Sequence, residues 1–147
     1  MKCYIKVLDL CAELTWESEN LIGFEFIDSI PKDMRMCLEL QTQLDAYTHH
    51  QLSTFEVKLK PRGTEFQRKV WEALLTIPYG QTRSYKEIAE LIGHPKAYRA
   101  VGMACHTNPI GLIIPCHRVL GSKGQLTGYA GGLDLKKKLL MHEKTAI

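Results

Sequence analysis

The sequence predicts an α+β protein: a small N-terminal antiparallel sheet with a helix, then a mostly helical C-terminal domain containing a helix-turn-helix. Strand-type apolar runs gather in the N-terminal half, and two helix-capping motifs follow residue 63. The charge also changes sign. Residues 1–57 hold four Lys/Arg and ten Asp/Glu, whereas residues 58–147 hold fifteen and six. We therefore expect a supporting subdomain at 1–57 and a second domain at 58–147, joined by a connector at 58–63.

Composition narrows the class of protein. The 147 residues are 45% hydrophobic and 24% charged, which is typical of a globular domain. No apolar run approaches the roughly 18–20 residues that span a membrane. The first residues carry charges at Lys2, Lys6 and Asp9 and lack the apolar core of a signal peptide. We therefore expect a cytoplasmic protein with no membrane partner.

The cysteine content argues against a disulfide framework. An odd count leaves at least one thiol unpaired, and a cytosolic compartment keeps thiols reduced. The sequence has no Cys-x-x-Cys spacing of the kind that indicates a zinc site, so no metal is expected. A metal site formed by Cys3, Cys11 and Cys37 with a histidine is the alternative. The five cysteines are Cys3, Cys11, Cys37, Cys105 and Cys116.

The N-terminal half has the pattern of a sheet and one helix. Residues 3–10 and 21–27 are rich in strand-forming residues, and the polar residues 17–20 form a turn between them. Pro31 is expected to open a helical stretch, and residues 55–59 alternate as a short strand would. The apolar face of the helix would consist of Cys37, Leu40, Leu44 and Tyr47.

Helix signals dominate after residue 63. Thr64–Gln67 and Ser84–Glu87 are both capping boxes, and the first helix should end before Pro78. Gly93 is suited to a helix C-terminus, and Pro95 to the first position of the next helix. Two short helices joined by a tight turn with glycine are a helix-turn-helix pattern, although many such hairpins are only structural.

The second helix of this pair is the candidate for nucleic-acid contact. Small residues would give it one face that lets its backbone approach a groove closely, and longer side chains would fall on its other sides. Together with the basic C-terminal half, this predicts DNA binding. The small residues are Ala97, Ala100, Val101 and Ala104, and the longer ones are Lys96, Arg99 and Met103.

A reactive thiol is the candidate for chemistry. Asn108-Pro109 ends the helix, and the apolar run 111–114 leads to Pro115-Cys116-His117-Arg118-Val119. Cys116 could equally be a small buried residue, because cysteine is among the most buried types. Two glycine-containing loops follow, at 121–125 and 128–132. The last helix, about 133–143, should turn Leu135, Leu139 and Leu140 inward and Lys136, Lys137 and Lys138 mostly outward.

From residue 64 to the end, the chain resembles the O6-alkylguanine-DNA alkyltransferases, or methylated-DNA–protein-cysteine methyltransferases. The N-terminal half fits loosely. Many spaced motifs in order make the resemblance specific: Gly80, Ser84-Tyr85, Gly93-His94-Pro95, Arg99-Ala100-Val101-Gly102, Asn108-Pro109, Ile114-Pro115-Cys116-His117-Arg118-Val119, Gly128-Tyr129-Ala130-Gly131-Gly132-Leu133 and Lys136-x-x-Leu139-Leu140-x-x-Glu143.

The resemblance implies direct-reversal DNA repair. Cys116 would accept an alkyl group from O6-alkylguanine, with O4-alkylthymine an open second substrate. His117 would be its base partner, Glu143 would orient and charge the histidine, and Asn108 would brace the preceding turn. Tyr85 would help to rotate the target phosphate and base out. The leaving guanine also needs a proton, which Tyr85 or a nearby donor would supply. The base pocket would be lined by Val119, Tyr129, Ala130 and Gly131.

The resemblance also implies how DNA is held. A helix from Pro95 to about Cys105 would lie in the minor groove of double-stranded DNA, and Arg99 would enter the base stack. The protein would be a monomer that reacts once, without cofactor. The implied DNA-binding residues are Arg99, Tyr85, Lys86, Pro95, Lys96 and Ser122.

The chemistry requires these residue types. Displacement at saturated carbon needs a soft nucleophile, and a free thiol with pKa about 8.5 is mostly protonated at neutral pH, so we expect a neighbouring cationic histidine to hold the thiolate. Neighbours in a strand point to opposite faces, so Cys116 and His117 cooperate only if the chain turns there or a water bridges them. Two alternatives are a lesion-binding protein without transfer, which the cysteine disfavours, and a cysteine hydrolase, for which no oxyanion loop is evident.

Overall fold

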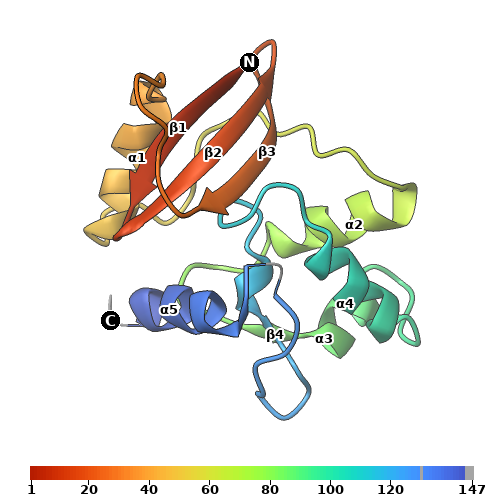
Figure 1. The fold of residues 1–147 in the computed structure, drawn as a ribbon. Coiled ribbons are helices and arrows are strands. Elements are labelled where there is room, and N and C mark those ends of the chain that lie inside the picture. Colours follow the sequence, from red (N-terminus) through yellow and green to blue (C-terminus); the bar gives the residue numbers. More distant parts are fainter. Residues whose placement is uncertain (130, 145–147) are drawn as a thin grey trace. The chain divides into compact units, whose positions relative to one another are not determined.

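The structure is a computed structural model that describes residues 1–129 and 131–144. The chain divides into two compact units (Figure 1): unit 1, residues 1–62 with 109–111, and unit 2, residues 63–108 and from 112 onward. The expected boundary after residue 57 falls shortly before this division. Residues 58–60 belong with unit 1 because Leu21 N–H donates to the Lys58 carbonyl (2.8 Å) and Lys60 N–H donates to the Leu21 carbonyl (2.9 Å).

Unit 1 is built on a three-stranded antiparallel sheet in the order β1-β2-β3. The strands are β1 (Lys2–Val7), β2 (Leu10–Glu17) and β3 (Asn20–Ile27), which confirms the predicted sheet. The segment 109–111 also lies against β3, since Phe24 N–H donates to the Pro109 carbonyl at 2.8 Å. Ile110 is thereby fully buried.

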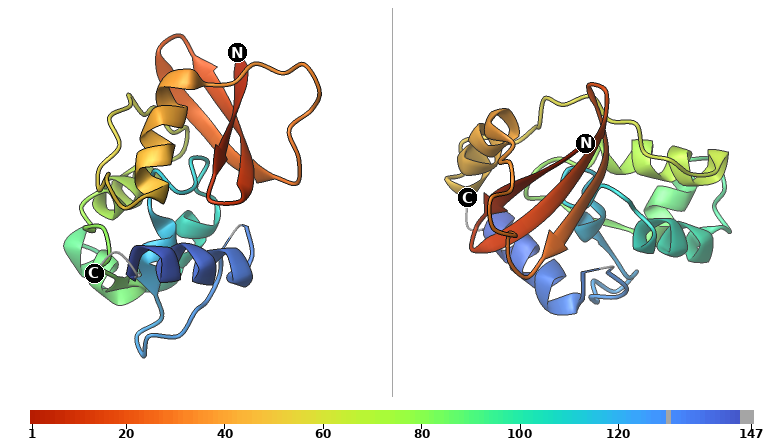
Figure 2. Two further views of the ribbon diagram at one scale, coloured as in Figure 1. Left: turned by 90° about the vertical axis from the view of Figure 1, so that its left-hand side faces the viewer. Right: turned by 45° about the horizontal axis from the view of Figure 1, so that its top comes forward.

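One helix, α1 (Leu38–Thr48), packs along this sheet (Figure 2). It buries Leu40, Leu44 and Tyr47, as the spacing predicted. The expected start at Pro31 is wrong, because the residues just before α1 are held extended against β1. Tyr4 N–H donates to the Arg35 carbonyl, and Cys37 N–H donates to the Tyr4 carbonyl, both at 2.9 Å. The predicted strand at 55–59 is also wrong: only a single bridge, Leu59 to Leu21, forms.

A disulfide joins Cys3 of β1 to Cys37 at the start of α1. The expectation that the thiols stay reduced is therefore wrong for this pair. The pairing also removes these two sulfurs from the alternative metal site. Cys11, Cys105 and Cys116 are free thiols.

Unit 2 is mostly helical. Its helices are α2 (Glu65–Leu74), α3 (Tyr85–Leu91), α4 (Tyr98–His106) and α5 (Leu133–Lys144). Unit 2 also contains a short parallel pair of strands, β4 (Arg83–Ser84) and β5 (Val119–Leu120). Both predicted capping boxes are present at α2 and α3. The Trp71 indole N–H donates to the Ala104 carbonyl at 2.8 Å and fastens α2 to α4.

Helices α3 and α4 form the helix-turn-helix. Gly93 has φ +83°, a conformation that favours glycine, at the end of α3. The expected start of the second helix at Pro95 is wrong. Pro95 and Lys96 lie in a turn closed by Ala97 N–H and the His94 carbonyl (2.9 Å). The inner face of α4 is consequently Val101, Ala104 and Cys105, and Ala100 is exposed.

Candidate active site

Cys116 lies at the start of a 3-10 turn, η1 (Cys116–Arg118). Cys116 N–H donates to the Ile114 carbonyl at 2.8 Å, and Arg118 N–H to the Pro115 carbonyl at 3.0 Å. Cys116 and His117 are both buried. The chain therefore does turn at Pro115, so the two side chains are not forced onto opposite faces of a strand.

Asn108 fixes this turn and contacts the sulfur. Its side-chain amide donates to the Ile114 carbonyl at 2.9 Å and lies 3.2 Å from Cys116 Sγ. The amide thus holds the backbone before the cysteine and supplies a donor to the sulfur. This position fits the bracing role that the sequence predicted.

His117 is oriented by Glu143. His117 Nε2 lies 2.7 Å from Glu143 Oε2, and both residues are buried. A carboxylate only accepts hydrogen bonds, so Nε2 carries the proton and Nδ1 of the neutral ring is an acceptor. Nδ1 is buried and has no hydrogen-bond partner among the described residues. This nitrogen is therefore free to accept a proton.

Arg118 is a buried part of the same cluster that sequence reasoning missed. Its Nε donates to Glu143 Oε1 at 2.7 Å and its Nη2 to Oε2 at 3.1 Å. Its Nη1 donates to the Ile77 carbonyl at 2.8 Å, and the guanidinium lies 5.7 Å from the Tyr79 ring centre. The available signal was its place directly after the Cys-His pair. Glu143 is thus shared between a histidine and an arginine.

Burial sets the protonation states of the cluster. It raises the pKa of the Cys116 thiol, against the opposing hydrogen bond from Asn108. It also lowers the pKa of His117, against the opposing effect of Glu143. Burial alone would raise the pKa of Glu143, but the hydrogen bonds with His117 and Arg118 outweigh it and lower that pKa. The resting site is a neutral thiol and a neutral imidazole beside a carboxylate, which differs from the expected imidazolium–thiolate pair.

A second network surrounds Tyr85. Its hydroxyl donates to the Thr127 carbonyl at 2.9 Å, and Lys136 Nζ donates to the same carbonyl at 2.7 Å and to the Tyr85 oxygen at 3.2 Å. Burial raises the pKa of Tyr85 and lowers that of Lys136. The charge of Lys136 also lowers the pKa of Cys116. The thiol, the phenol and the ammonium group are therefore electrostatically linked.

Lys136 is fully buried, so the prediction that it points outward is wrong. Positions three, four and seven residues apart share one helix face. Lys136 therefore lies on the same face of α5 as the buried Leu139, Leu140 and Glu143. The spacing of Lys136 to these residues can be read from the sequence, but a run of three lysines suggested that all three were solvated.

The expected base-pocket residues have different surroundings. Val119 is fully buried in β5, and Tyr129 is buried with its side chain hydrogen-bonded to that of Cys116. Gly131 is exposed, and a side chain there would lie 2.5 Å from Leu135 Cδ2 and 3.2 Å from the Tyr129 ring. Ala130 lies outside the described residues.

The expected DNA-binding residues are at the surface of unit 2. Arg99 is exposed on α4, with its guanidinium 6.0 Å from the centre of the exposed Tyr98 ring. Met103, one turn further, is also exposed. Tyr85 is half-buried. The remaining residues of the set are exposed: Lys86, Pro95, Lys96 and Ser122.

Together these features define a class. A buried cysteine held by an amide beside a His–Glu–Arg cluster indicates a thiol-dependent enzyme. The helix-turn-helix in the same unit, with exposed lysines and an arginine, indicates nucleic acid as its partner.

Comparison with known proteins gives the same answer. Residues 65–145 match the family described as 6-O-methylguanine DNA methyltransferase, DNA binding domain. A methylated-DNA–protein-cysteine methyltransferase of Methanosarcina barkeri is 60% identical over 106 residues, covering 72% of this chain and 67% of the relative. The crystal structure of Mycobacterium tuberculosis OGT in complex with DNA is 43% identical with a TM-score of 0.87, and the match covers 97% of this chain and 93% of that one.

The chain therefore belongs to the methylated-DNA–protein-cysteine methyltransferase family. The predicted family, α+β fold class and enzyme class are confirmed. A shorter match is the Schizosaccharomyces pombe Atl1 in complex with damaged DNA, 36% identical with a TM-score of 0.51 over 56% of this chain and 78% of that one. Among the described residues, no helix is long and apolar enough to cross a membrane.

Proposed function

We propose that this chain repairs O6-alkylguanine in double-stranded DNA by transferring the alkyl group to Cys116, once per molecule. The observation that carries the proposal is the placement of Cys116 Sγ, 3.2 Å from the Asn108 amide and one residue from the paired His117. The thioether formed is stable, and we assign no residue to its hydrolysis. The protein then acts stoichiometrically, as a cytoplasmic monomer on chromosomal DNA.

The nucleophile is generated by transfer of the thiol proton. As Sγ attacks the alkyl carbon, the bond from that carbon to O6 breaks and its electron pair stays on guanine. The thiol proton passes to Nδ1 of His117, directly or through one water, and Glu143 stabilises the imidazolium. A neutral Cys116 thiol and a neutral His117 imidazole suit this buried site, because a resting thiolate–imidazolium pair would cost the free energy of desolvating two charges.

The leaving guanine is neutralised from the second network. The Tyr85 side chain is half-buried, and the fully buried Lys136 has its Nζ 3.2 Å from the Tyr85 oxygen. When Tyr85 gives its proton to the departing base, the ammonium group stabilises the phenolate that remains. Val119, Tyr129 and Gly131 line the base pocket in this mechanism.

The DNA is held through α4 in its minor groove. Lys86, Lys96 and Ser122 contact the backbone, and Pro95 leads into the helix. The lesion must leave the stack to reach a buried sulfur, which costs a few kcal/mol. Arg99 enters the gap and offsets part of that cost.

Transfer itself is the test. A duplex with one O6-methylguanine should lose its methyl group on incubation with the wild type. Cys116→Ser should bind the same duplex and leave the methyl group in place. If the wild type binds the lesion and removes nothing, the lesion-binding alternative holds instead.

The role of Arg99 has its own test. Arg99→Ala should slow transfer from duplex DNA by about 100-fold, while reaction with free O6-benzylguanine, which needs no flipping, should change less than about threefold. Lys69→Ala, on α2, is the matched control because it also removes one exposed cation. Equal losses with both substrates would remove Arg99 from the flipping step.

A further inference from the structure

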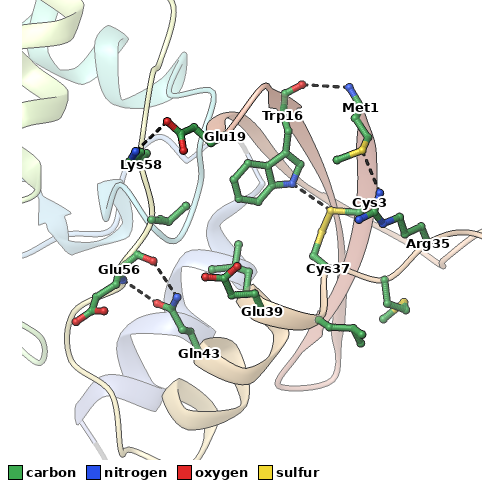
Figure 3. Close-up of a pocket in the computed structure, with 14 residues that line it drawn as sticks. Met1, Cys3, Trp16, Glu19, Arg35, Cys37, Glu39, Gln43, Glu56 and Lys58 are labelled. Atoms are coloured by element: carbon green, nitrogen blue, oxygen red, sulfur yellow. Dashed lines mark hydrogen bonds and ion pairs between the residues drawn. A yellow bond between two sulfur atoms is a disulfide. The ribbon is translucent and has the colours of Figure 1, made fainter.

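Unit 1 contains a cavity of about 730 Å³ that the proposed repair reaction does not use. Figure 3 shows Cys3, Cys37 and Trp16 together along it. The cavity is lined by both apolar and charged side chains. The apolar ones include Met36, Leu38 and Val57, and the charged ones include Arg35, Glu39 and Glu56. The disulfide is therefore reachable by a small molecule.

The first sulfur of the disulfide has an unusual donor. The indole N–H of Trp16 donates to Cys3 Sγ at 3.1 Å. A hydrogen bond to sulfur strengthens when the sulfur becomes a thiolate, because a charged acceptor binds a donor more strongly. This hydrogen bond therefore helps Cys3 to leave as a thiolate when the disulfide is attacked.

The second sulfur lies at a helix N-terminus. Cys37 is the N-cap residue of α1, which has 11 residues, and its side chain makes no capping hydrogen bond. A helix N-terminus stabilises a thiolate through its exposed N–H groups and its dipole, so it favours the release of Cys37 as a thiolate after the disulfide has opened. Cys37 is also the more exposed of the two, at 9% against 4% for Cys3. An incoming thiol therefore meets Cys37 first.

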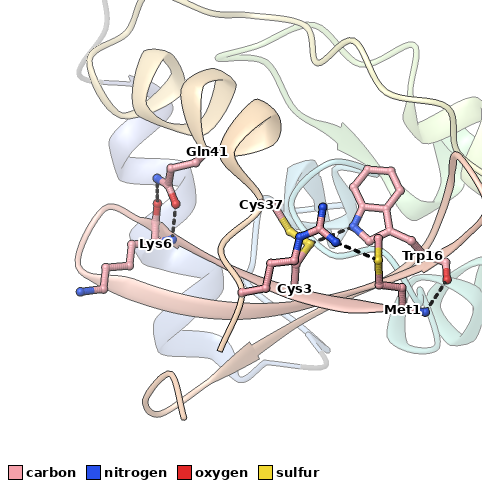
Figure 4. Close-up of a disulfide and its surroundings, with 7 residues drawn as sticks. Met1, Cys3, Lys6, Trp16, Cys37 and Gln41 are labelled. Atoms are coloured by element: carbon pink, nitrogen blue, oxygen red, sulfur yellow. Dashed lines mark hydrogen bonds between the residues drawn. A yellow bond between two sulfur atoms is a disulfide. The ribbon is translucent and has the colours of Figure 1, made fainter. Parts of the chain in front are cut away.

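The fold can keep its shape when this bond opens. Cys37 N–H donates to the Tyr4 carbonyl and Tyr4 N–H to the Arg35 carbonyl, so the segment stays paired with β1. Gln41 of α1 binds both backbone groups of Lys6, at 2.6 and 2.7 Å (Figure 4). These bonds hold both α1 and the segment before it against β1 without the disulfide. Opening it is thus a local event that does not require unfolding of unit 1.

We propose that Cys3–Cys37 is a thiol-exchange site for low-molecular-weight thiols that enter this cavity. The thiolate of the small molecule attacks Cys37 Sγ, the Sγ–Sγ bond breaks, and Cys3 leaves as a thiolate held by Trp16. A second molecule attacks the outer sulfur of the mixed disulfide. It releases Cys37 as a thiolate and carries away the oxidised small-molecule disulfide. Two electrons pass from two thiols to the protein, and Cys116 takes no part.

The test is exchange with reduced glutathione on the whole folded chain. The protein is incubated with the thiol, quenched in acid, alkylated and mapped by peptide mass. We expect a glutathione adduct on Cys37, a free Cys3 and an unchanged far-ultraviolet circular dichroism spectrum. A disulfide that opens only in denaturant, or an adduct that forms on Cys3 first, would overturn the proposal.

Two variants sharpen the result. Trp16→Phe keeps an aromatic ring but removes the N–H donor, so exchange should slow by about tenfold. Cys11→Ser, which removes a free thiol of unit 1, should leave the rate unchanged. If Trp16→Phe exchanges as fast as the wild type, the indole does not hold the leaving thiolate and the proposed mechanism is wrong. None of these measurements depends on alkyl transfer, so the proposed function can fail without affecting them.

Discussion

The buried ion pair of Arg118 and Glu143 should separate stability from catalysis. Glu143→Gln keeps the shape of the side chain and its contact with His117 but removes the charge. Arg118 then keeps a buried, unpaired positive charge. Arg118→Met creates the opposite imbalance. The double variant removes both charges and leaves a neutral cluster.

The structure gives the size of these effects. Breaking a buried ion pair from one side costs about 3–5 kcal/mol of unfolding free energy, whereas removing both charges is often nearly neutral. The double variant also leaves the Ile77 carbonyl without the 2.8 Å donor from Arg118, which costs about 1 kcal/mol. We therefore expect a loss of about 3–5 kcal/mol for each single variant and only about 1–2 kcal/mol for the double.

Urea unfolding, followed by circular dichroism, measures the stabilities. Single-turnover transfer from O6-methylguanine DNA measures the catalytic role. Transfer should be slowed at least about 100-fold in Glu143→Gln and should stay slow in the double variant, because the imidazolium still lacks its carboxylate. Strictly additive stability losses, or recovery of transfer in the double variant, would refute this reasoning.

Three further outcomes are expected. The pKa of Cys116 is raised and that of His117 is lowered, so the proton moves between two neutral groups. The transfer rate should therefore be flat from about pH 6.5 to about pH 8.5 and fall only at lower pH, where His117 becomes protonated. A tenfold rise per pH unit across this range would indicate an ordinary free thiol. Lys136→Met should slow transfer about 100-fold with little loss of stability, while Lys137→Met, at an exposed position, should change neither quantity. Equal effects of the two variants in stopped-flow transfer assays would show that Lys136 does not stabilise the Tyr85 phenolate. Binding to undamaged duplex DNA, measured by fluorescence anisotropy, should weaken steadily with salt as counterions are released, and a flat response would contradict a basic docking surface.

Local signals in the sequence were sufficient to place the starts of α2 and α3. The Thr64–Gln67 and Ser84–Glu87 boxes each involve residues three positions apart, so their hydrogen bonds depend on little else. The start of α4 was misplaced because Pro95 is equally compatible with a turn. Only the hydrogen bond between Ala97 and His94 decides between the two.

Contacts between distant residues explain what the sequence did not reveal. The disulfide links positions 34 residues apart, through a pairing of β1 with the segment before α1 that no local pattern encodes. Arg118 acquires its role from Glu143 on α5, and Lys136 from the Tyr85–Thr127 contact. A lysine in a run of three is usually solvated, and here packing of α5 against the rest of unit 2 overrides that tendency.

The central claim is that the sulfur of Cys116 is the final acceptor. It is tested most directly by peptide mass after incubation with a duplex containing one O6-methylguanine. We predict that the peptide containing Cys116 gains the mass of one methylene unit, with one methyl group transferred per protein molecule and none on the peptides of Cys11 or Cys105. An unchanged Cys116 peptide, or a methyl group on another residue, would contradict the account.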